Sequence, residues 1–73
     1  MNNKELKELI GAKIKERRKQ LNISQGELAS ALGINQSMIS NYETGRYMPE
    51  FPMQVKMFDY LGINFSELMK DKI

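Results

Sequence analysis

The chain has 73 residues, of which 41% are hydrophobic, a net charge of +2, and neither cysteine nor histidine. A chain of this length forms a single domain, residues 1–73, near the lower size limit for folding on an apolar core alone. Without cysteine and histidine, the usual nucleophiles, general bases and metal ligands are missing, so we expect no enzyme activity, no metal site and no cofactor. No segment approaches the roughly 20 apolar residues of a membrane span, and the first residues lack the apolar stretch of a signal peptide. We therefore expect a cytoplasmic protein that does not bind membranes.

The positive charges are unevenly distributed. Residues 13–19 contain five lysines and arginines against one glutamate, whereas residues 20–45 contain neither lysine nor arginine. A basic cluster of this kind is either a patch that faces phosphates or the solvated face of a helix. The charge pattern alone does not decide between the two.

Hydrophobic spacing and capping residues predict the first two helices. Apolar residues recur at spacings of three, four and seven, which predicts an amphipathic helix at about residues 3–20. These residues are Leu6, Leu9, Ile10, Ile14 and Leu21. Ser24 and Glu27 form a capping box, which predicts a second helix from Ser24 to about Ala31. Gly33 follows, where a helix commonly ends in a left-handed conformation.

Three further helices follow the same logic. Asn35 is a good N-cap for a third helix at about residues 36–43, and Gly45 suits its end. Pro52 suits the first turn of a fourth helix at about residues 52–60. Asn64 caps a short fifth helix that ends near residue 70. No strand pattern appears, so the sequence predicts a compact all-α domain of five helices.

Residues 24–44 have the pattern of a helix-turn-helix. Ala29 is small where two steeply crossed helices approach closely, and Gly33 supplies the turn between them. On the third helix, Ile39 and Tyr42 are three residues apart and face the core. In such a unit the second of the two helices is free to enter the major groove of DNA.

Several segments resemble the Cro and phage-repressor (Xre-like) family of helix-turn-helix transcriptional regulators. Residues 23–29 resemble the opening of the family's second helix, and residues 39–46 resemble its recognition helix and exit loop. Residues 61–68 resemble its final turn and helix. The resemblance covers about residues 10–69 and implies a lambda-repressor-like fold.

The resemblance implies that Gln36, Ser37 and Asn41 contact base edges, with Ser40 beside them at a base or a phosphate. Chemistry supports this independently, because glutamine and asparagine can bond adenine through two atoms, and serine can donate or accept. The alternative is an ordinary polar helix face.

The resemblance also implies contacts to the DNA backbone from Gln25, Arg46 and Tyr47, the last two together with their backbone amides. Asn35, expected mainly as a cap, belongs with this group. The alternative for Arg46 is a solvated loop charge.

Other residues are expected to support the recognition helix. The resemblance pairs Arg18 with Glu43, and we expect this pair to orient the helix rather than to touch DNA. Ala29, Gly33 and Ile39 support the same helix through packing and the turn.

The fourth helix departs from the family pattern. Phe58 stands where members carry alanine, and Phe51 stands where a capping serine or threonine is usual. We expect a core repacked around larger side chains; the alternative is that Phe51, Met53 or Phe58 contributes to self-association.

These observations predict sequence-specific binding of double-stranded DNA, with the third helix in the major groove. We expect a transcriptional regulator, a repressor, that binds an inverted-repeat operator as a homodimer and needs no small-molecule ligand. The alternative is a protein-interaction or antitoxin-like module with the same fold.

Overall fold

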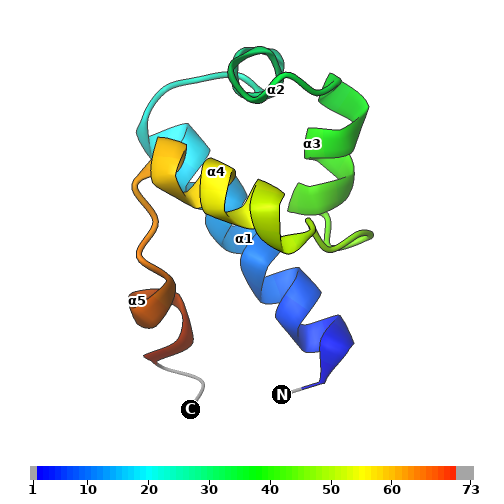
Figure 1. Cartoon of the computed structure of the whole chain (residues 1–73), viewed down its shortest axis with the longest axis vertical. Coiled ribbons are helices and arrows are strands. Elements are labelled where there is room, and N and C mark those ends of the chain that lie inside the picture. Colours follow the sequence, from blue (N-terminus) through cyan, green and yellow to red (C-terminus); the bar gives the residue numbers. More distant parts are fainter. Residues whose placement is uncertain (1, 71–73) are drawn as a thin grey trace.

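The computed structural model describes residues 2–70, and every regular element in that range is a helix. The helices are α1 (Asn3–Gln20), α2 (Gln25–Leu32), α3 (Gln36–Glu43), α4 (Phe51–Leu61) and the short α5 (Phe65–Lys70). Figure 1 shows α1 behind α4, with α2 and α3 at one end of the molecule and α5 toward the other. The predicted all-α class is confirmed. Within these residues, no helix is long and apolar enough to cross a membrane.

Local capping explains where α2 and α3 begin. The Ser24 hydroxyl accepts a hydrogen bond from the Glu27 amide at 3.0 Å. The Glu27 carboxylate in turn accepts a hydrogen bond from the Ser24 amide at 3.0 Å. Asn35 Oδ1 accepts a hydrogen bond from the Met38 amide at 3.0 Å. The predicted capping box and the predicted N-cap are therefore both present, and each satisfies amides that a helix start leaves without partners.

At Gly11, α1 approaches the backbone of α3 closely. A Cβ atom there would overlap the Tyr42 carbonyl oxygen and lie 2.8 Å from that of Glu43. Only glycine allows this approach. The role of Gly11 was not predicted from the sequence, although a glycine inside a helix is unfavourable enough to signal a packing role.

The core combines apolar side chains from α1, α2, α3 and α4. Its fully buried members are Ile10, Ile14, Leu28, Ile39, Met57 and Leu61. Leu21, predicted as part of the α1 stripe, is 40% exposed. The reason is that α1 ends at Gln20, so Leu21 is its C-cap and leaves the helical stripe.

Two of the bulky residues of α4 have different environments. Phe58 is 5% exposed and belongs to the core, as expected, whereas Phe51 is 73% exposed, so the core interpretation was wrong for it. Phe51 comes in the first turn of α4, where its side chain lies outside the packed face. Together with Val55 and Phe65 it lines an apolar groove between α4 and α5.

Candidate nucleic-acid interface

The α2–turn–α3 unit is closed by local hydrogen bonds and small side chains. Gly33 has a positive φ of 73°, and the amide of Ile34 donates to the Ala29 carbonyl at 3.0 Å. The Ala29 side chain is 3% exposed and that of Ile39 is fully buried. In Figure 1, α2 is seen along its axis while α3 runs down the side, so the two helices cross steeply.

α3 has a buried face and a polar outer edge. Ile39, Tyr42 and Glu43 are buried. Among the polar residues of α3, Gln36 and Ser37 are exposed, whereas Ser40 and Asn41 are half-buried. We call these four residues the α3 polar edge. All of them are uncharged, so this edge offers hydrogen-bond donors and acceptors rather than net charge.

The cap of α3 restricts what Ser37 offers. Its hydroxyl donates to Asn35 Oδ1 at 2.6 Å, and the same oxygen accepts the Met38 amide. The hydroxyl hydrogen of Ser37 is thus used inside the cap, and its lone pairs are left as acceptors. Asn35 is the N-cap of α3, and its geometry does not indicate a contact with the DNA backbone.

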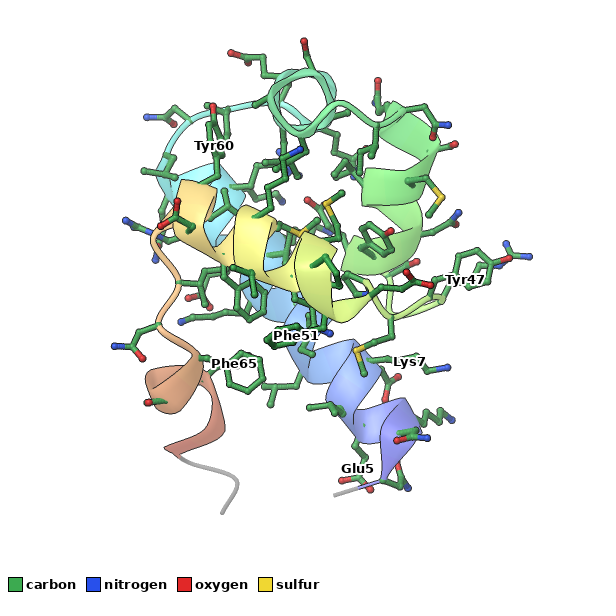
Figure 2. All side chains as sticks on the ribbon, in the orientation of Figure 1. Glu5, Lys7, Tyr47, Phe51, Tyr60 and Phe65 are labelled. Atoms are coloured by element: carbon green, nitrogen blue, oxygen red, sulfur yellow. The ribbon has the colours of Figure 1, made fainter. Side chains whose placement is uncertain are left out.

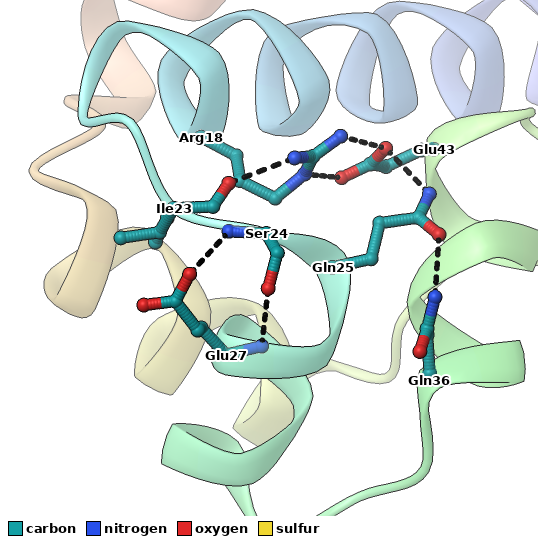
Figure 3. A network of polar contacts seen from close by, with 7 residues as sticks. All are labelled: Arg18, Ile23, Ser24, Gln25, Glu27, Gln36 and Glu43. Carbon is teal, nitrogen blue, oxygen red and sulfur yellow. Dashed lines mark hydrogen bonds and ion pairs between the residues drawn. The ribbon is translucent and has the colours of Figure 1, made fainter.

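A buried ion pair joins α1 to the end of α3 (Figure 3). Arg18 Nε donates to Glu43 Oε2 at 2.6 Å, and Nη2 donates to Oε1 at 3.1 Å. Arg18 Nη1 donates to the Ile23 carbonyl at 2.8 Å. Both residues are 8% exposed. The hydrogen bond to Glu43 raises the pKa of Arg18 above its usual value although burial opposes it, so the guanidinium stays charged.

Two glutamines extend this ion pair to the α3 polar edge. Gln25 Nε2 donates to Glu43 Oε1 at 3.0 Å, and Gln36 Nε2 donates to Gln25 Oε1 at 3.4 Å. From the sequence, Gln25 was predicted only as a phosphate contact. Its bridge to Glu43 joins residues 18 positions apart, for which the local sequence contains no signal. We call the chain Arg18–Glu43–Gln25–Gln36 the relay.

The exit loop after α3 presents side chains rather than amides. The amides of Arg46 and Tyr47 both donate to the Asn41 carbonyl, at 3.0 and 3.3 Å. Both side chains are exposed, and the Arg46 guanidinium carbon lies 5.8 Å from the centre of the Tyr47 ring. In Figure 2, Tyr47 projects away from the body of the protein. These two amides, which were expected to bind phosphate, are therefore already used in hydrogen bonds within the loop. Only the side chains of Arg46 and Tyr47 are left to contact phosphate.

The basic cluster of residues 13–19 does not form one phosphate-facing patch. Arg18 is buried against Glu43, and Arg17 Nε donates to the Leu61 carbonyl at 2.8 Å. Lys13 pairs with Glu16 at 3.1 Å. The two arginines hold α1 to α3 and α4, so only part of the cluster is solvated.

A steeply crossed helix pair whose second helix carries an outward polar edge defines a helix-turn-helix domain. Residues 14–68 match the family model described as Helix-turn-helix. The chain belongs to this family, in its Cro and phage-repressor (Xre-like) group, and is a DNA-binding transcriptional regulator.

Two curated proteins of phage origin are similar to it. The ImmF control region 10 kDa protein of Bacillus phage phi105 is 45% identical over 64 residues, which cover 88% of this chain and 71% of the relative. The cryptic phage CTXphi transcriptional repressor RstR of Vibrio cholerae serotype O1 is 38% identical over 60 residues, which cover 77% of this chain. The matched region spans about half of that second relative, 54% of its length.

Proposed function

We propose that this protein represses transcription by binding an inverted-repeat operator as a homodimer, with α3 of each copy in the major groove. The observation that carries the proposal is the α3 polar edge, held on a rigid support by the buried ion pair of Arg18 and Glu43. Repression is favoured by the name of the Vibrio cholerae relative, which is a transcriptional repressor.

The length of α3 supports the use of two copies. Its eight residues span about 12 Å at about 1.5 Å per residue. At about 3.4 Å per base pair this length covers only three or four base pairs. A second copy on a symmetric half-site, about one helical turn away or a multiple of it, supplies the missing specificity.

Selection from a random duplex library tests this proposal directly. We expect an inverted repeat to be enriched and two copies to bind each selected duplex. An enriched site without symmetry, bound by one copy, would contradict the dimer. If no sequence is enriched while a heterologous protein forms a stable complex, the domain is an interaction or antitoxin-like module instead.

Replacing Gln36 by alanine is expected to lower the affinity for DNA through the loss of a contact at one base pair only. The loss of a two-atom contact to a base costs about 1–3 kcal/mol when the preferred base is present. Affinities for duplexes with each of the four bases at every position measure this. Gln20→Ala, at the exposed end of α1, is the matched control. An equal loss on every duplex would show that Gln36 does not read a base.

Replacing Arg46 by alanine is expected to weaken binding on every duplex alike. Its exposed guanidinium replaces one counterion at a phosphate, so the slope of log K against log salt should flatten by about one unit. Binding curves at several salt concentrations measure the slope. Lys4→Ala, in the first turn of α1, is the control for a change in net charge. The same slope in both variants would place Arg46 away from DNA.

A further inference from the structure

We propose that Glu43, although buried, makes the protein prefer adenine over guanine at the base pair that Gln36 reads. It does so by fixing the orientation of two side-chain amides in the relay (Figure 3). This inference rests on the proposed function, because it concerns the base contact of Gln36.

The chemistry of a carboxylate sets the first orientation. A carboxylate only accepts hydrogen bonds, so the end of the Gln25 amide that lies 3.0 Å from Glu43 Oε1 must be its NH2 group. Arg18 donates to both oxygens of Glu43, so both oxygens of this group act as acceptors. Gln25 therefore turns its carbonyl oxygen toward Gln36.

The second orientation follows from the first. Gln36 Nε2 donates to Gln25 Oε1 at 3.4 Å, whereas a flipped Gln36 amide would bring two acceptor oxygens together. Gln36 is left with one N–H donor and one acceptor oxygen for a base. Adenine offers a matching acceptor at N7 and donor at N6, whereas guanine offers two acceptors, N7 and O6. The relay thus makes Gln36 complementary to adenine.

Glu43→Gln is expected to reverse the relay. The bond from Arg18 Nε to Oε2 is the shortest in the group, at 2.6 Å, so the new amide keeps its oxygen there. Its NH2 group then replaces Oε1, which gives up the longer bond from Arg18 Nη2 at 3.1 Å, and donates to Gln25, whose amide flips. Gln36 must now accept from Gln25, which leaves two N–H donors for the two acceptors of guanine.

Gln25→Met breaks the relay while leaving the ion pair of Arg18 and Glu43 intact. The Gln36 amide then has no partner within the relay to orient it. If Gln25 also binds a phosphate, its removal weakens binding to both duplexes alike, and this effect cancels in the ratio of the two affinities. Gln20→Met is the matched control, because Gln20 accepts a bond from Arg17 and lies outside the relay.

The experiment measures the ratio of affinities for two duplexes that differ only by adenine or guanine at the base pair affected by Gln36→Ala. Circular dichroism confirms that each variant is folded under the binding conditions. We expect the wild type and Gln20→Met to prefer adenine by about tenfold or more. The Gln25→Met ratio should fall to within about threefold, and Glu43→Gln should move the preference to guanine.

Two results would overturn the inference. One is a Gln25→Met ratio equal to that of the wild type, and the other is an unchanged ratio in folded Glu43→Gln. Either would leave the proposed function standing, because Gln36 would still read its base pair. A wild type that shows no base preference at any position, or a Gln36→Ala variant that changes no ratio, would instead refute the proposed function itself.

Discussion

Replacing Gly11 by alanine is expected to destabilise the protein by about 3 kcal/mol or more. The added methyl group would meet the backbone carbonyl oxygens of Tyr42 and Glu43, and backbone cannot move aside as a flexible side chain can. Overpacking costs about 1–3 kcal/mol where side chains can adjust, so this site should reach or exceed the upper end of that range. The loss is a large part of the roughly 4–11 kcal/mol expected for a domain of this size.

Urea unfolding measures the effect, and Gly26→Ala is the matched control. Gly26 lies in the first turn of α2, and a Cβ there would approach no atom more closely than 3.5 Å. Alanine at Gly26 should therefore leave stability unchanged or raise it by about 0.5–1 kcal/mol. Equal effects at the two glycines would mean that α1 does not approach the backbone of α3 this closely.

The second large effect is expected from Arg18→Met. This change leaves the Glu43 carboxylate buried without its cation, and breaking a buried pair in this way costs about 3–5 kcal/mol. The double variant Arg18→Met with Glu43→Leu removes both charges, so it should recover much of the lost stability. The free energies of unfolding of the single and double variants form a double-mutant cycle that measures the coupling.

Arg17→Met serves as the control for the loss of an arginine from α1. Arg17 is only half-buried, and its Nε donates to the Leu61 carbonyl rather than to a carboxylate. Its removal should cost about 0.5–1.5 kcal/mol, the value of an ordinary hydrogen bond. If the two arginine variants lost the same stability, the buried pair would not be what holds α1 to α3.

Gly11 and Arg18 act on the same end of α3. They lie seven residues apart on α1, which is about two helical turns, so both face α3. Gly11 lets α1 reach the backbone at Tyr42 and Glu43, and Arg18 binds the Glu43 side chain. Gln36, at the opposite end of α3, is instead bonded to α2 through Gln25. α3 is therefore held at its two ends by two different helices.

Local chemistry in the sequence was sufficient to predict most of the secondary structure. The capping residues Ser24 and Asn35 and the turn at Gly33 act within a few positions of themselves, so they place α2 and α3 correctly without knowledge of the fold. The three-residue spacing of Ile39 and Tyr42 identified the core face of α3 for the same reason. The DNA contacts of the α3 polar edge stay predictions until binding is measured.

The remaining features depend on groups that only the folded chain brings together. The interior glycine at Gly11 matters because α3 approaches it, and Gln25 is a bridge because Glu43, 18 residues later, lies beside it. The arginines of the basic cluster point to different helices, and Phe51 stays exposed because the other elements leave its side unpacked. Sequence alone determined the approximate position of each helix, since the capping and spacing signals are local, although α4 begins at Phe51 rather than at Pro52. The tertiary structure decided which side chains meet across helices, since the distances between them depend on how the helices pack.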